Sequence, residues 1–366
     1  MRVKISYDWI ILVVLFSFKI LLFFGVPTVF IYSLILTLLS YWVYLNKKIS
    51  KESSIYVFGL FLISMIDKFN DFSTNGNLGL FIIPFSFLLI TSFFFNTKLD
   101  VRKALPRIVL INILILFLLN LKTPFAAYDR DITTLIVFYS ILSYKRFNSK
   151  VLILIAFLIT FLLFESRTSI FSFIAFLAIV TIKKNYPIVK KSIILFTVII
   201  STAIISTVIY YETSVTKGVS VEFTGRGIIW ERAISNTLGS NIKNILLGSP
   251  SNPKDLEEIF GTIRIQGKKN QSEHMRDILL AGNFHNGIVY IIFNTGVIGL
   301  TLFSILAIKF LNNTKNTFEI ALFISIYIIY FFNGRGITSL YIDSIILIYI
   351  LSRTRSNANI THQVRT

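Results

Sequence analysis

Long apolar runs separated by short polar or basic connections fill most of the chain. Dividing them at their polar breaks gives twelve segments: 8–24, 28–45, 53–66, 78–95, 107–121, 132–144, 151–164, 169–182, 192–211, 285–308, 317–332 and 337–351. A bilayer core of about 30 Å needs roughly 20 helical residues, and several segments have only about 14, so their boundaries are approximate. The runs are longer and alternate less than barrel strands. This pattern predicts an all-α polytopic membrane protein with about 12 transmembrane helices.

One long polar stretch, residues 212–284, separates the first nine apolar segments from the last three. We therefore expect one integral membrane domain in three parts: residues 1–211 with nine spans, a 212–284 loop, and residues 285–366 with three spans and a tail. The amino-terminal run has no small-residue cleavage site and is followed at once by another apolar run, which predicts an uncleaved first span.

Composition supports a membrane protein and limits its chemistry. Mean hydropathy is +0.74, and 54% of the residues are hydrophobic against 15% charged, more than a soluble core could bury. The net charge of +18 does not indicate nucleic acid binding, because the basic residues lie in short clusters between apolar runs. The chain has no cysteine, which excludes disulfides and zinc–thiolate sites.

Basic residues are divided unequally between alternate connections. Of the 36 Lys and Arg residues, 21 lie at the two termini or in every second connection. The intervening short connections hold only Lys68, Lys122, Arg130, Arg167 and Arg335. By the positive-inside rule, both termini and the basic connections are cytoplasmic, and the 212–284 loop lies on the outer face.

Arg167 lies between two apolar arms, in the sequence Glu165-Ser166-Arg167-Thr168-Ser169. The far ends of both arms belong to the cytoplasmic set, so the arms should form a hairpin with Arg167 at its outer tip. One interpretation is a polar turn in which Arg167 pairs with Glu165. The other is a fixed anion site, for example for a lipid phosphate, since arginine binds phosphate well at a membrane boundary.

Arg226 and Trp230 come early in the long loop, after Thr224 and Gly225. Thr224 could cap a helix that places Arg226 and Trp230 one turn apart on one face. The alternative is an amphipathic helix lying on the membrane, with Trp230 as an interfacial anchor. Arg232, in the same segment, is a supporting candidate.

His285 stands where the loop enters the next apolar helix, in Asn283-Phe284-His285-Asn286. The positive end of a helix dipole and nearby arginines disfavour imidazolium, which would leave a neutral ring able to accept a proton. A capping or packing histidine is the plainer interpretation. His274 is the rival base, and Arg276 and Arg335 could support the site.

The helix that follows His285 contains Asn294, Gly296 and Gly299, which would let other helices approach closely. Elsewhere, Asp129-Arg130-Asp131 has the spacing of a carboxylate metal motif, but such triplets are common by chance, and we predict no metal and no other cofactor. Four further polar residues lie in or near spans: Lys19, Asn112, Glu319 and Asp343. They would suit a translocation path, yet they form no chain of neighbours and no inverted repeat.

In this order, the motifs resemble the O-antigen polymerase and O-antigen ligase superfamily of bacterial envelope glycan assembly. The resemblance rests on Arg167 in Ser-Arg-Thr-Ser at a hairpin tip, on Thr-Gly-Arg226-x-x-x-Trp230, and on Phe-His285-Asn286 before Asn-Thr-Gly-Val-Ile-Gly-Leu. It covers the span layout and residues 161–300. One departure is that Gly does not follow Arg167, as it often does in the family.

The resemblance implies an inverting glycosyltransferase of the bacterial inner membrane, with its active site facing the periplasm. Its donor would be a sugar chain on undecaprenyl pyrophosphate, and it would need no metal. Arg167 and Arg226 would bind the pyrophosphate, and His285 would orient or deprotonate the acceptor hydroxyl. Membrane lipids, a chain-length regulator and other polysaccharide assembly proteins are the implied partners.

Three functions are compatible with these motifs. The one we favour is an O-antigen polymerase, which transfers the growing chain onto the next lipid-linked repeat unit. An O-antigen ligase, which transfers the chain to lipid A core, is the near alternative. A flippase or other transporter of lipid-linked oligosaccharides is more distant, because the candidate residues gather on the outer side and not at the membrane midplane.

Overall fold

The computed structural model describes residues 7–46, 51–70, 76–97, 101–122, 126–147, 150–162, 167–185, 226–249, 286–314, 316–333 and 342–352. All regular secondary structure in these ranges is helical, which confirms the all-α prediction. The helices are α1 (Tyr7–Phe16), α2 (Phe18–Phe23), α3 (Thr28–Asn46), α4 (Lys51–Asn70), α5 (Gly76–Asn96), α6 (Val101–Lys122), α7 (Ala126–Phe147), α8 (Lys150–Leu162), α9 (Arg167–Asn185), α11 (Arg226–Leu238), α12 (Ile242–Leu247), α15 (Gly287–Asn313), α16 (Thr317–Asn333) and α17 (Ile342–Ser352).

These helices follow the apolar segments of the sequence. Eleven of the twelve predicted segments coincide with described helices, and the remaining one, 192–211, lies outside the described residues. The first segment is divided at Ser17 into α1 and α2. By length and composition alone, one helix of the described part is long and apolar enough to cross a membrane, Gly287–Asn313, and this helix is interrupted at Gly296.

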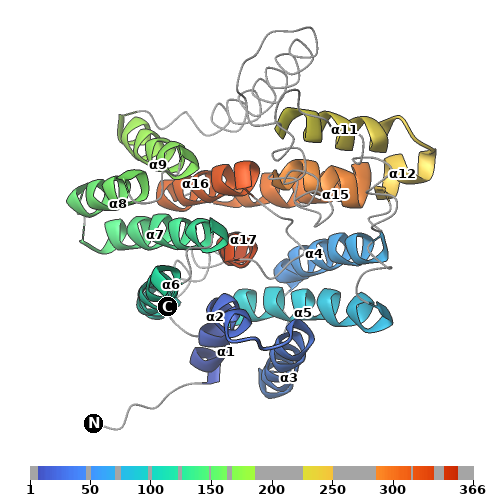
Figure 1. Cartoon of the computed structure of the whole chain (residues 1–366), viewed down its shortest axis with the longest axis horizontal. Coiled ribbons are helices and arrows are strands. Elements are labelled where there is room, and N and C mark those ends of the chain that lie inside the picture. The colour runs from blue at the N-terminus through green and yellow to red at the C-terminus, as the bar shows by residue number, and fades with distance from the viewer. Residues whose placement is uncertain are drawn as a thin grey trace, which may run out of the picture.

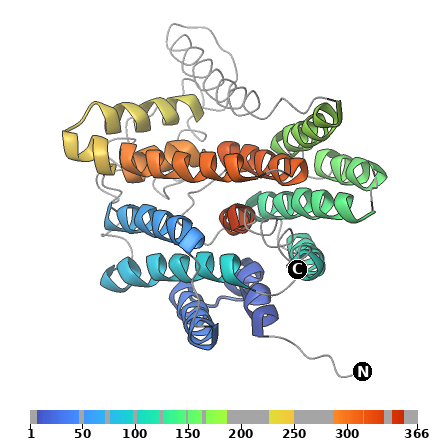
Figure 2. The same cartoon turned by 180° about the vertical axis from the view of Figure 1, so that it is seen from behind.

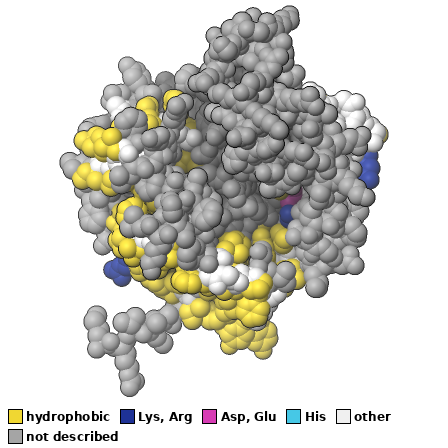
Figure 3. Space-filling view, viewed as in Figure 1, with side chains coloured by type: hydrophobic (Ala, Val, Ile, Leu, Met, Phe, Trp, Pro, Cys, Tyr) yellow, Lys and Arg dark blue, Asp and Glu magenta, His cyan; other side chains and the backbone are white. Residues whose placement is uncertain are grey.

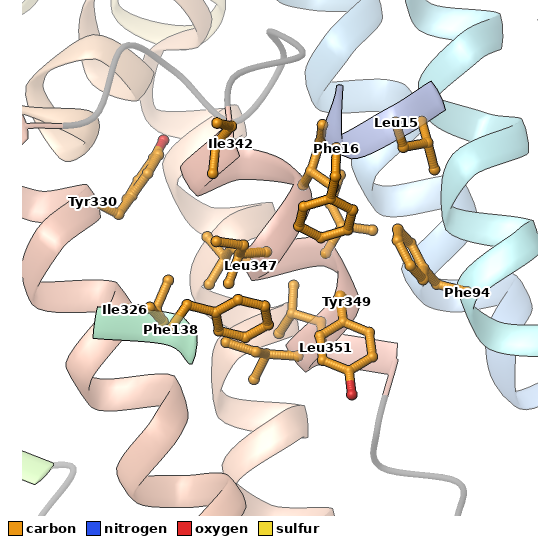
Figure 4. Packing of buried hydrophobic residues seen from close by; sticks show 14 of the residues in the cluster. Leu15, Phe16, Phe94, Phe138, Ile326, Tyr330, Ile342, Leu347, Tyr349 and Leu351 are labelled. Carbon is orange, nitrogen blue, oxygen red and sulfur yellow. The ribbon is translucent and has the colours of Figure 1, made fainter. Parts of the chain in front are cut away.

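Helix α17 runs through the centre of the bundle (Figures 1 and 2). Ile342 and the residues from 345 to 351 are all buried, and the helix contacts α1, α5, α7, α15 and α16. The ring of Tyr349 lies 5.7 Å from that of Phe94 and 6.0 Å from that of Phe138, measured between centroids, and Figure 4 shows this packing. Because neighbours surround it, α17 needs no polar face, which explains its nearly unbroken apolar sequence.

Helices α8 and α9 form the hairpin that the charge pattern predicts. The rings of Phe157 and Phe173 face each other across it, with centroids 6.5 Å apart, and Arg167 is the first residue of α9. Helix α9 then packs along α16 in the opposite direction. Ser172 Oγ donates a hydrogen bond of 2.8 Å to the Ser325 carbonyl.

Asp8, in the first turn of α1, joins three parts of the chain. Its Oδ1 accepts a 2.9 Å hydrogen bond from Trp42 Nε1 on α3, and its Oδ2 accepts one from Thr97 Oγ1, just after α5. A carboxylate in a first helical turn is also favoured by the helix dipole. The sequence gives no sign of this role for Asp8, since a single acidic residue beside an apolar run forms no pattern.

We expect Asp8→Ala to lower the free energy of unfolding by about 2 kcal/mol, because it leaves the Trp42 and Thr97 donors without their acceptor. Thermal unfolding of the purified protein in detergent measures this effect. Thr37→Ala is the matched control, because Thr37 Oγ1 bonds to the Ser33 carbonyl of its own helix at an exposed position. Equal unfolding midpoints for the two variants would contradict the role of Asp8.

Candidate functional site

Helix α15 is interrupted at Gly296, whose φ of 61° and ψ of −160° are not helical. The consequence is seen at Tyr330 of α16. Its ring centroid lies 6.0 Å from that of Phe303, while the same ring packs directly on Gly287. A straight helix would hold residues 287 and 303 about 24 Å apart. The two parts of α15 are therefore folded towards each other, and the Tyr330 ring contacts both of them, at Gly287 and at Phe303.

The end of α12 docks at this interruption. Gly248 caps α12 with φ +92°, and the following Ser249 N–H donates a 2.7 Å hydrogen bond to the Phe293 carbonyl of α15. A Cβ added at Gly248 would lie 2.6 Å from the Phe293 oxygen, and one added at Gly296 would lie 2.6 Å from the Gly248 nitrogen. The sequence predicted a close approach at Gly296. The approaching group is the backbone at the end of α12.

Helix α11 lies beside α15 in both views (Figures 1 and 2) and connects to this junction. Asn236 Nδ2 of α11 donates to Ser249 Oγ at 3.1 Å. Trp230, on the same helix, is 2% exposed, and its ring lies edge-on to Phe331 of α16 with centroids 6.4 Å apart. Trp230 is thus packed inside the protein, which argues against its interpretation as an interfacial anchor.

Two helix starts lie at the carboxyl end of α16. At the start of α15, Tyr330 Oη donates to the Gly287 carbonyl at 3.3 Å. At α11, Trp230 on Phe331 is one turn after Arg226, the first residue of that helix. The amino ends of α15 and α11 therefore both lie near the carboxyl end of α16.

The register of α9 against α16 brings a third helix start to this region. Ser172 contacts Ser325, and Phe176 lies 5.9 Å from Phe318, so the two helices run in opposite directions. Five residues back from Ser172 is Arg167, and five residues forward from Ser325 is Tyr330. Since each helical residue rises by about 1.5 Å, the backbone of Arg167 lies at the level of Tyr330.

The structure thus brings the backbones of the helices that begin at the three sequence motifs to the same end of α16. Arg167 and Arg226 begin α9 and α11, and α15 begins two residues after His285. Of the supporting candidates, Trp230 is buried and Arg232 is half-buried on α11. Four candidates lie outside the described residues, namely His285, His274, Arg276 and Arg335. The side chains of Arg167 and Arg226 are also outside the described part, although their backbones are within it.

Two residues at this end of α16 were not assigned a role from the sequence alone. Asn286 caps α15, with Oδ1 accepting from the Ile288 and Val289 N–H groups. An Asn just before an apolar run is a known helix-start signal that could have identified it. Tyr330 carries no such signal, because it lies within an apolar run and its role depends on Gly287, far away in the sequence.

The weaker candidates are not brought into this region by any contact described. Asp131 is buried on α7, and in the part of the chain that the structure describes, no group of three His, Cys, Asp or Glu residues could hold a metal. Asn112 donates to the Ile108 carbonyl of its own helix at 2.9 Å, and Glu319 is buried in the first turn of α16. The side chains of Lys19 and Asp343 lie outside the described residues.

Alanine at Gly248 or Gly296 should separate α12 from α15, because each position needs a left-handed backbone and has no room for a Cβ. We expect each variant to lose about 3 kcal/mol or more of stability and to lower the unfolding midpoint in detergent. Gly25→Ala is the control, since Gly25 has φ +75° but nothing within 4 Å of an added Cβ. It should lose only about 1 kcal/mol. A loss at Gly248 no larger than at Gly25 would refute the close contact.

Comparison of the chain with protein-family models, with curated proteins and with solved structures gave no match in any of the three. A functional assignment therefore depends on the motifs and on the arrangement of the helix starts around α16.

Proposed function

We propose that this protein is a bacterial inner-membrane glycosyltransferase, an O-antigen polymerase that acts at the periplasmic face. It transfers the growing glycan from undecaprenyl pyrophosphate onto the next lipid-linked repeat unit. The observation that carries the proposal is the convergence of three helix starts, those of α9, α11 and α15, at the carboxyl end of α16. These are the helices that begin at or just after Arg167, Arg226 and His285.

The outer surface of the helix bundle supports a location in the membrane. Exposed apolar side chains recur every three to four residues along α6 and α8: Leu110, Ile111, Leu114, Phe117, Leu118, Leu154, Ile155, Leu158, Ile159 and Leu162. Figure 3 shows hydrophobic side chains gathered along the left and lower parts of the face in view. The inward faces of these helices are covered by the bundle, and a bilayer is the environment that would cover their apolar outward faces.

Converging helix starts suit a diphosphate leaving group. The amino end of a helix carries a partial positive charge and free N–H groups, and both favour phosphate. Arg167 and Arg226 would add two full positive charges at this place, and guanidinium groups can bind phosphate oxygens in pairs. In the proposed reaction, fixed cations take the part that a metal ion takes in other transferases.

The reaction breaks the bond between the sugar and the diphosphate oxygen, and the electron pair stays on the diphosphate. The acceptor hydroxyl oxygen forms the new bond to the sugar from the opposite side, and its proton passes to a base. His285, next to the positive start of α15, is the base we propose, because the helix dipole favours the neutral ring before the transfer. The arginines stabilise the charge that develops on the leaving group.

A transporter of lipid-linked oligosaccharides is a second candidate that one observation favours. The interruption of α15 at Gly296 is a type of feature that transporters use at their binding sites. Here, however, the end of α12 already fills the interruption and bonds to the Phe293 carbonyl. A transporter would place its binding site near the membrane midplane, whereas the charge pattern predicts that the motif residues lie towards the outer side, so we favour the transferase.

Deletion of the gene tests the function and separates polymerase from ligase. Loss of a polymerase should leave lipopolysaccharide with a single repeat unit on the core, seen as one band on a gel. Loss of a ligase should leave bare core together with unattached polymer. For a transporter, purified protein in detergent would produce no longer glycan from lipid-linked repeat units, whereas a polymerase would.

Substitution of the motif residues tests the site. Arg167→Ala, Arg226→Ala and His285→Ala should each reduce chain extension by about 100-fold or more, because each removes a group that stabilises or enables the transition state. The protein should remain in the membrane at its normal level. Lys243→Ala is the control, since Lys243 is an exposed cation of the same loop on α12. Normal chain length in all three motif variants would exclude this site.

A further inference from the structure

Asn286 carries a buried hydrogen-bond donor that has no partner among the described residues. The residue is 0% exposed, and its Oδ1 accepts from the N–H groups of Ile288 at 2.9 Å and Val289 at 3.0 Å. Its Nδ2, in contrast, has no hydrogen-bond acceptor in the described part of the chain. A buried amide nitrogen without a partner is destabilising, so capping α15 does not by itself explain an asparagine at this position.

Ser, Thr or Asp would supply the same capping oxygen without the two extra N–H donors of the asparagine amide. The orientation of this amide is fixed by its bonds. If oxygen and nitrogen were exchanged, the nitrogen would face the Ile288 and Val289 N–H groups, which are donors themselves. The cap therefore holds Nδ2 in a constant position at the start of α15.

The surroundings of Asn286 indicate what this donor binds. Asn286 follows His285 directly, and Gly287 is held by the Tyr330 ring and hydroxyl at the carboxyl end of α16. The starts of α9 and α11 lie at the same end. An N–H donor beside the positive end of a helix is suited to an anionic oxygen more than to a neutral hydroxyl.

We propose that Asn286 Nδ2 donates a hydrogen bond to a phosphate oxygen of the polyprenyl diphosphate on the donor substrate. The inference rests on the proposed function and adds to it a neutral donor that the motif arginines do not provide. The hydrogen bond strengthens as the glycosidic bond breaks, because the phosphate oxygens then gain negative charge. Asn286 would thus both cap α15 and stabilise the leaving group.

Binding of farnesyl diphosphate, a short prenyl diphosphate, to the purified full-length protein in detergent tests this role. Asn286→Ser keeps a capping oxygen and removes the amide donors, and it should bind the diphosphate about 10-fold more weakly or worse. Asn286→Asp keeps the cap but adds a negative charge, so its loss should be larger. Farnesol, which has no phosphate, should bind the wild type and both variants equally.

Asn241→Ser is the matched control. Asn241 caps α12 in the same way, with its side chain accepting from the Asn244 N–H at 3.0 Å, but it lies on the exposed surface. This variant should bind farnesyl diphosphate as the wild type does. Thermal unfolding should give similar midpoints for Asn286→Ser and Asn241→Ser, which separates a binding role from a structural one.

The outcomes distinguish this inference from the proposed function. If the wild type extends lipid-linked glycan and binds farnesyl diphosphate, but Asn286→Ser binds it equally well, the Asn286 inference is wrong and the transferase assignment stands. A buried water molecule on Nδ2 would give this result. If the wild type neither extends glycan nor prefers farnesyl diphosphate to farnesol, the proposed function fails, and the inference fails with it.

Discussion

The backbone contact between Gly248 and Gly296 is the constraint on which the arrangement around α16 depends. Helix α15 is interrupted at Gly296, and the Phe293 carbonyl close to the break needs a hydrogen-bond donor in an apolar environment. The Ser249 N–H satisfies it, and only glycine lets the two backbones come close enough. Through Asn236, the same junction holds α11 in place, and α11 carries Trp230 to Phe331.

Helix α16 provides the fixed support for these contacts. It is buried along most of its length and packs against α9, α15 and the central helix α17. Gly287 and Trp230 pack against the last turns of α16. The pairing of α16 with α9 places the backbone of Arg167 beside these same turns. A site built in this way has rigid helix starts as its framework, which suits a reaction in which positive charge must be in place before the leaving group departs.

Buried polar side chains at the ends of helices serve different purposes from those within helices. Ser172 bonds to the neighbouring α16, so the polarity of its side chain serves the packing of the bundle. Asn112 Nδ2 bonds within its own helix, while its Oδ1 has no partner in the described part of the chain. Asn286, at a helix start, keeps a donor without a partner in the described part of the chain. An unmet buried group at a helix start is a stronger indication of anion binding than one within a helix, such as Asn112 Oδ1, because the helix start supplies a positive environment.

The sequence by itself determined the helices, their approximate limits and the α8–α9 hairpin, because long apolar runs and the spacing of basic residues are local properties of the chain. It also identified Arg167, Arg226 and His285 as candidates, although it could not show that the helices beginning there meet at α16. That meeting, the burial of Trp230 and the break at Gly296 were decided by the tertiary structure alone. Each depends on a contact between residues far apart in the chain, such as Gly248 with Gly296 or Gly287 with Tyr330, and no local preference of either residue encodes its partner.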